Sequence, residues 1–143
     1  MDGNTELLNY VYQNAQMGER STAQLTELSE SPKFREHLQT QNREYESIRG
    51  QARDLLRQSG HEEKDINGFA KMSLYMSIGT KTLTDKSASH MAEMMMRGST
   101  MGIIDVSKNL KKYAGADPEA VSLAEKLLRT EEANVEHIKA FLS

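Results

Sequence analysis

Apolar side chains recur every three or four positions along four long stretches of this chain, and short polar breaks separate the stretches. The stretches cover residues 5–30, 32–59, 86–113 and 118–143. Such spacing places the apolar side chains on one face of an α-helix. The sequence therefore predicts four helices of similar length that bury their apolar faces against one another.

The residues at the breaks support these bounds. Ser31-Pro32 and Asp117-Pro118 each place a capping side chain before a proline, which is favoured at the first position of a helix. Gly60 is the expected left-handed terminator of the second helix, and Gly115 ends the third. The first and last connections are so short that each must join two antiparallel neighbours, which gives two helical hairpins.

The connection between the second and third helices is long, about 25 residues, and we expect a short helix over residues 66–78 within it. A simple up-and-down bundle does not need such a connection. A bundle whose second and third helices run parallel does need it, because the chain must return along the whole bundle. We therefore predict an all-α four-helix bundle with a short crossover helix, and a single domain over residues 1–143.

Several polar residues lie where the predicted core should be apolar. The first helix carries Glu19, and the others carry Gln41-x-x-Glu44, His90 and Glu93, and Glu131-x-x-Asn134. This arrangement resembles the ferritin-like superfamily, in particular its small uncharacterised bacterial four-helix-bundle members and, more remotely, its spore-coat members. In that superfamily a Glu on one helix and a Glu-x-x-His on its hairpin partner, given twice, hold two metal ions. Neither i+3 position of this chain carries the histidine.

The resemblance implies a carboxylate metal site. Its candidate ligands are Glu19, Glu44, Glu93, Glu131 and His90. Iron or manganese would occupy such a site as a di-metal centre. In the alternative, a single metal ion would be held by Glu19, Glu44, Glu93 and His90. The missing histidines favour a degenerate site, in which the polar residues form a metal-free hydrogen-bonded layer and no cofactor is bound.

In the metal-free alternative, other side chains satisfy the carboxylates. Glu19 and Glu44 lie at similar distances on either side of the first hairpin turn, so we expect them to be level. Tyr45 is expected to donate its hydroxyl to Glu19, and Arg97 to pair with Glu93 or Glu131. We expect His37 and His61 at the surface and His137 at the rim of the bundle.

Composition excludes several classes of function. The net charge is -3 and the pI about 5.8, so the basic surface that nucleic acid requires is absent. The chain has no cysteine, which rules out disulfides and a thiolate nucleophile. No apolar run reaches the ~20 residues of a membrane helix, and no secretory signal is visible, so we expect a cytoplasmic protein. No catalytic triad, phosphate loop or dinucleotide-binding pattern indicates an enzyme or a small-molecule substrate.

The third helix suggests a role in assembly. It carries a methionine cluster and two glycines four residues apart, which would allow another helix to approach closely: Met91, Met94, Met95, Met96, Gly98, Met101 and Gly102. We therefore predict a non-catalytic bundle that self-associates through this helix and retains a polar core. The alternative is a metal-binding oxidase or an iron-handling protein that uses the four glutamates.

Overall fold

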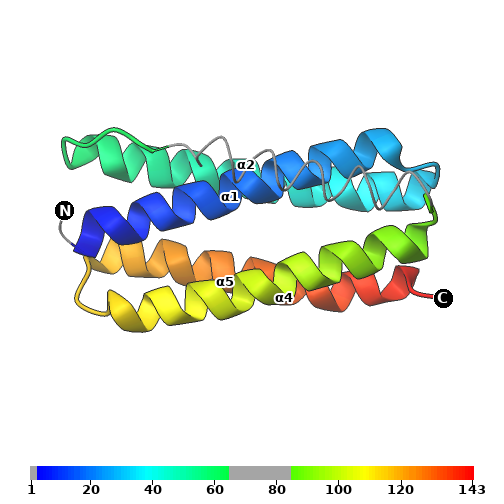
Figure 1. Ribbon diagram of the computed structural model, residues 1–143. Coiled ribbons are helices and arrows are strands. Elements are labelled where there is room, and N and C mark those ends of the chain that lie inside the picture. The colour runs from blue at the N-terminus through cyan, green and yellow to red at the C-terminus, as the bar shows by residue number, and fades with distance from the viewer. Residues whose placement is uncertain (1–2, 65–84) are drawn as a thin grey trace.

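A computed structural model describes residues 3–64 and 85–143, and all regular elements in these two ranges are helical (Figure 1). They are α1 (Gly3–Leu28), α2 (Pro32–Gln58), α4 (Ala88–Lys112), α5 (Pro118–Ile138) and a short 3-10 helix (Lys139–Phe141). The four long helices confirm the all-α prediction, with most ends within two residues of those expected. The predicted short helix over residues 66–78 lies outside the described residues.

Local interactions explain where the helices begin and end. The Ser31 hydroxyl accepts the backbone N–H of Phe34 at 3.3 Å, and Gly60 has a φ of 81°, as the sequence predicts for a cap and a left-handed terminator. Asp117 differs from the prediction because its side chain makes no capping hydrogen bond. Its backbone N–H instead donates to Asn4 Oδ1 at 3.2 Å, which ties the start of α5 to the start of α1.

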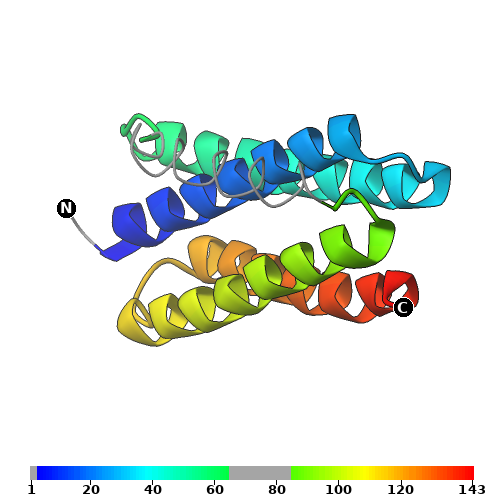
Figure 2. The ribbon, with the colours of Figure 1, turned by 45° about the vertical axis from the view of Figure 1, so that its right-hand side comes forward.

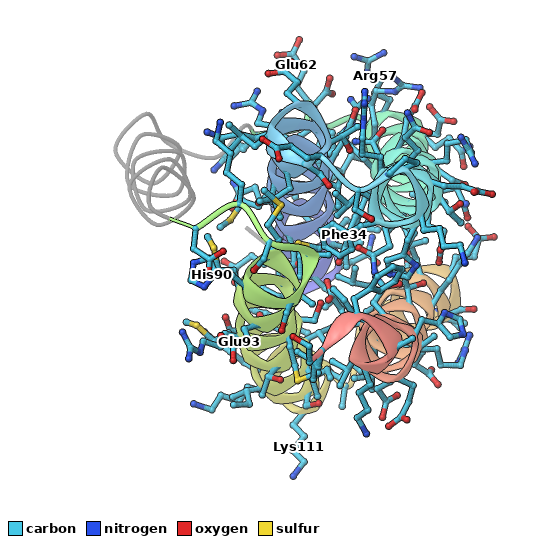
Figure 3. The ribbon with its side chains drawn as sticks, turned by 90° about the vertical axis from the view of Figure 1, so that its right-hand side faces the viewer. Phe34, Arg57, Glu62, His90, Glu93 and Lys111 are labelled. Atoms are coloured by element: carbon cyan, nitrogen blue, oxygen red, sulfur yellow. The ribbon has the colours of Figure 1, made fainter. Side chains whose placement is uncertain are left out.

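The helices form two antiparallel hairpins, α1–α2 and α4–α5, that pack against each other (Figures 1 and 2). Figure 1 shows that α2 and α4 run in the same direction along the bundle, and that α1 and α5 run in the opposite direction. In the end view of Figure 3, α1 lies beside α2 and above α4, while α5 lies below α2. The parallel direction of the second and third long helices is therefore as predicted.

The core consists of two apolar clusters. The larger cluster holds Leu7, Leu8, Val11, Tyr12, Ala15, Tyr45, Ile48, Ala52, Leu56, Val106, Ala120, Leu123, Ala124 and Leu127. The smaller cluster, at the other end of the bundle, holds Leu25, Phe34, Leu38, Met91, Ala92, Met95 and Ile138. Buried polar residues occupy the turns of helix between the two clusters: Gln16, Thr22, Gln41, Ser99, Glu131 and Asn134. The bundle therefore has a polar layer near its middle, as the sequence suggested.

None of the four long helices of the described residues has an apolar stretch of the length needed to cross a lipid bilayer.

Candidate functional site, a buried polar layer

Glu131 and Tyr45 form the centre of the polar layer. The Tyr45 hydroxyl donates to Glu131 Oε1 at 2.9 Å. The side-chain amide of Asn134 donates in turn to the oxygen of the Tyr45 hydroxyl, with Nδ2 at 3.4 Å. Glu131 is 3% exposed and Tyr45 is 2% exposed, so the pair joins α5 to α2 inside the bundle. The prediction that Tyr45 donates to Glu19 is wrong: its partner comes from the second hairpin.

Two glycines make room for this pair. A Cβ atom at Gly102 of α4 would lie 3.3 Å from both the carboxyl carbon and Oε1 of Glu131. A Cβ atom at Gly18 of α1 would lie 2.7 Å from three ring atoms of Tyr45. Helices α1 and α4 thus approach the pair with bare backbone, and any larger residue would force the pair to move. Gly98 and Gly102 were predicted to let another helix approach, whereas the neighbour of Gly102 is the Glu131 carboxyl of the same chain and an added Cβ at Gly98 would meet no atom within 4 Å.

Burial determines the charge state of Glu131. Loss of solvent raises the pKa of Glu131 to about 7, against the lowering effect of the Ser99 and Tyr45 hydroxyls, and the charge of Glu44 adds a smaller increase. Burial and the neighbouring carboxyl also raise the pKa of Tyr45 well above 10.0. The second oxygen of Glu131, Oε2, is buried and makes no hydrogen bond of standard geometry, although the Ser99 hydroxyl lies close enough to the carboxyl to lower its pKa. A neutral carboxyl is therefore the favoured form below pH 7.

Glu19 lies at the side of the layer and has a partner of its own. Arg49 Nε lies 2.5 Å from Glu19 Oε2, and both side chains are about a quarter exposed. Asn42 Nδ2 donates to the Glu19 carbonyl oxygen at 2.7 Å and to Thr22 Oγ1 at 3.0 Å. Glu19 is therefore level with Asn42, which confirms the predicted register of the first hairpin. Its carboxylate is nevertheless directed to Arg49, a residue that was not among the expected partners.

Glu93 and His90 lie on the outer side of α4. Figure 3 shows both side chains directed away from α5, and Glu93 is exposed. His90 Nδ1 is 3.9 Å from Glu93 Oε2 and 4.0 Å from Asp85 Oδ2, so these groups interact with one another. Arg97 is also exposed, and none of the ion pairs in the described part of the chain includes it. The structure thus does not pair Arg97 with Glu93 or Glu131.

Glu44 is the one predicted ligand near Glu131. It is half-buried; burial raises the pKa of Glu44, and the charge of His137 lowers it. The five predicted ligands thus lie in three places, and residues 3–64 and 85–143 contain no group of three or more His, Asp or Glu side chains placed to hold a metal ion. A di-iron centre needs carboxylates from four helices around one point, so this donor arrangement does not fit one.

The partners of two further polar residues differ from those expected from the sequence. Asn134 occupies the position where the ferritin-like pattern has a metal-binding histidine. In the structure its side-chain amide donates to the Tyr45 hydroxyl. Gln41 is fully buried and its Nε2 lies 2.8 Å from Nε2 of His37, which was expected at the surface. The spacing of four residues between His37 and Gln41 was a visible signal of this contact.

We expect Glu19→Gln to destabilise the protein by less than about 1 kcal/mol, because a partly exposed ion pair contributes little. Urea denaturation followed by circular dichroism measures the change. Glu63→Gln is the matched control, since Glu63 pairs with Arg57 at 2.6 Å on the surface. A loss several times larger than in the control would show that Glu19 has a role beyond the Arg49 pair.

Comparisons of this chain with protein-family models, with curated proteins and with solved structures give no match.

Proposed function

We propose that this chain is a non-catalytic, ferritin-like helical bundle of the cytoplasm that self-associates through the outer face of α4. That face is defined by Arg97, Gly98, Met101, Ile104 and Asp105. The observation that carries the proposal is the exposure of its two large apolar side chains, 65% for Met101 and 48% for Ile104. Exposed apolar side chains grouped on one helix favour a protein partner.

The occupant we propose is a second copy of the same face. Arg97 and Asp105 lie four residues on either side of Met101. In an antiparallel pair of α4 helices with a two-fold axis at Met101, Arg97 of each copy is level with Asp105 of the other. The same symmetry brings Ile104 level with Gly98, where an added Cβ would meet no neighbouring atom within 4 Å. Charge and size therefore complement each other across the axis.

The polar layer supports a structural role in the same bundle. The Glu131 carboxyl is held by Tyr45, is closely covered by Gly102 and is neutral below pH 7. Arg49 neutralises Glu19. The Tyr45–Glu131 contact joins α2 to α5 and constrains how the two hairpins dock, because other arrangements would leave these buried groups unpaired, whereas the partly exposed Glu19–Arg49 pair lies within the first hairpin.

We expect Met101→Arg to weaken self-association at least ten-fold, because the change places two like charges beside the two-fold axis. Sedimentation equilibrium over a range of protein concentrations measures it. Glu132→Arg, on the exposed side of α5, is the matched control and should leave the dimer intact.

A charge exchange tests the pairing of Arg97 with Asp105 across the axis. Arg97→Asp and Asp105→Arg should each weaken association, and the double variant that carries both changes should restore it. A wild-type protein that is monomeric at every concentration would contradict the proposal.

The second candidate function is a metal-binding oxidase or an iron-handling protein. Two observations favour it: Glu131 Oε2 is buried without a hydrogen bond of standard geometry, and Glu44 is close enough to raise the pKa of Glu131. Metal analysis of protein purified without chelator tests it. Stoichiometric iron or manganese that is lost in both Glu44→Gln and Glu131→Gln, and retained in Glu132→Gln, would favour this function over the first.

A further inference from the structure

Two histidines from different helices meet at the end of the bundle that holds Phe34. The ring centres of His37 on α2 and His137 on α5 are 6.3 Å apart, and the ring planes are at 82°. His37 is half-buried and His137 is exposed, so the pair is open to solvent on one side. Neither residue belongs to the polar layer around Glu131.

His37 is held in position from two sides. Its ring stacks on Phe34 with centres 6.5 Å apart, and it lies 5.4 Å from the ring of Phe141. Burial and the nearby His137 lower the pKa of His37, so its imidazole is neutral at pH 7 and keeps a lone pair. A neutral, oriented imidazole is what a metal ion requires.

The Gln41 amide can leave the second ring nitrogen of His37, Nδ1, free. Its amide nitrogen lies 2.8 Å from His37 Nε2, while its Oε1 is buried without a hydrogen-bond partner. The two ends of an amide are assigned from their contacts, and a half-turn of this amide exchanges them. Oε1 then accepts the Nε2–H of His37, which leaves Nδ1 unprotonated. A hydrogen bond from the second ring nitrogen to a carbonyl oxygen is the usual support of a metal-binding histidine.

We propose that His37 and His137 form a site for a divalent transition-metal ion of the zinc, nickel and copper group, with water completing the coordination. Imidazole suits these ions. A nitrogen–metal distance of about 2.0–2.1 Å places two imidazole rings on one ion with centres roughly 5–6 Å apart. The observed 6.3 Å is close to this range, and the exposed His137 is free to turn toward the ion.

Glu44 adds a supporting group. The charge of His137 lowers the pKa of Glu44, so the two side chains lie near each other. A carboxylate beside a metal-bound histidine accepts its second N–H and orients the ring. The bound ion would connect α2 to α5 next to the smaller apolar cluster, which includes Phe34 and Ile138. This inference does not depend on self-association through α4.

Calorimetric titration of the full chain with ZnCl2 at pH 7.5, after removal of metals by a chelator, tests the proposal. We expect one zinc ion per chain, and a decrease in affinity of at least ten-fold in each of His37→Ala and His137→Ala. His61→Ala and His90→Ala are matched controls and should bind as the wild type does, since both histidines lie outside the pair. MgCl2 should give no binding, because imidazole is a poor ligand for this ion.

Two results would overturn the proposal: a wild-type protein that binds no zinc, or zinc binding that is unchanged in His137→Ala. Loss of binding in His90→Ala with full binding in His137→Ala would place the ion beside Glu93 and would also overturn it. If His37→Ala does not fold, the decision rests on the exposed His137 and on NMR of the histidine rings. Zinc should then shift the ring signals of His37 and His137 and leave that of His61 unchanged.

Discussion

Replacement of Glu131 with glutamine is expected to stabilise the protein by about 3 kcal/mol at pH 8.5 and to have little effect near pH 4.5. Glutamine keeps the size of the side chain and an oxygen that accepts from the Tyr45 hydroxyl, which lies 2.9 Å from Glu131 Oε1. It cannot acquire the negative charge that burial disfavours. Only the cost of ionising Glu131 inside the bundle is removed.

The direction of the pH dependence follows from the raised pKa. Burial raises the pKa of Glu131 from 4.5 to about 7. Below pH 4.5 both folded and unfolded chains hold the proton, and its contribution to stability is fully present. Between these values only the folded chain holds it, so the free energy of unfolding falls as the pH rises and levels off above pH 7. At about 1.4 kcal/mol per unit of pKa, the total is about 3 kcal/mol.

Urea denaturation of the wild type and of Glu131→Gln at several pH values between 4.5 and 8.5 measures this difference. Glu132→Gln, at the exposed neighbouring position, should follow the wild type within about 0.5 kcal/mol at each pH. A destabilising effect of Glu131→Gln at pH 8.5 would contradict the account, because it would mean that the charged carboxylate contributes favourable contacts.

Gly18→Ala is expected to destabilise the protein by about 1–2 kcal/mol, although alanine in a helix interior is favoured over glycine by about 1 kcal/mol. The new Cβ would lie 2.7 Å from the Tyr45 ring. That ring cannot move aside easily, because Tyr45 is 2% exposed and its hydroxyl is bound to Glu131. The cost of overpacking is therefore larger than the gain in helix propensity.

Gly50→Ala is the matched control for Gly18→Ala. At Gly50 of α2 the nearest atom to a new Cβ is Arg53 Nη2 at 3.8 Å, an ordinary contact with a flexible side chain. This change should stabilise the protein by up to about 1 kcal/mol. Thermal or urea unfolding of both variants measures the contrast, and equal effects of the two changes would show that Tyr45 is not closely covered by α1.

The helices were predictable because their signals are local. The period of the apolar residues gave their faces, and the Ser31-Pro32 pair and Gly60 gave the bounds of α2. Asp117 was the exception, because its side chain makes no capping hydrogen bond. The backbone contact of Asp117 with Asn4 could not be predicted either, since it joins residues far apart in the sequence. The parallel direction of α2 and α4 was also predictable from the long connection between them, because the chain needs such a connection to return along the whole bundle.

The partners inside the polar layer depend on how the hairpins dock, and this information is not local. Glu19 and Gly18 are adjacent, so about 100° of helix rotation decides which of them faces Tyr45. The structure places Gly18 there and directs Glu19 to Arg49. Glu131 was correctly placed on a buried stripe, whereas its contact with Tyr45 crosses between α5 and α2 and could not be predicted from either helix alone.

The most direct test of the polar layer is a carbon-13 NMR titration of the glutamate side chains between pH 3 and 9. We expect one carboxyl to titrate with a midpoint near pH 7 and to be absent from the spectrum of Glu131→Gln. The Tyr45→Phe variant should keep a raised midpoint, because burial is its main cause. A spectrum in which every glutamate titrates near the ordinary pKa of 4.5 would contradict the buried, neutral Glu131 on which this account depends.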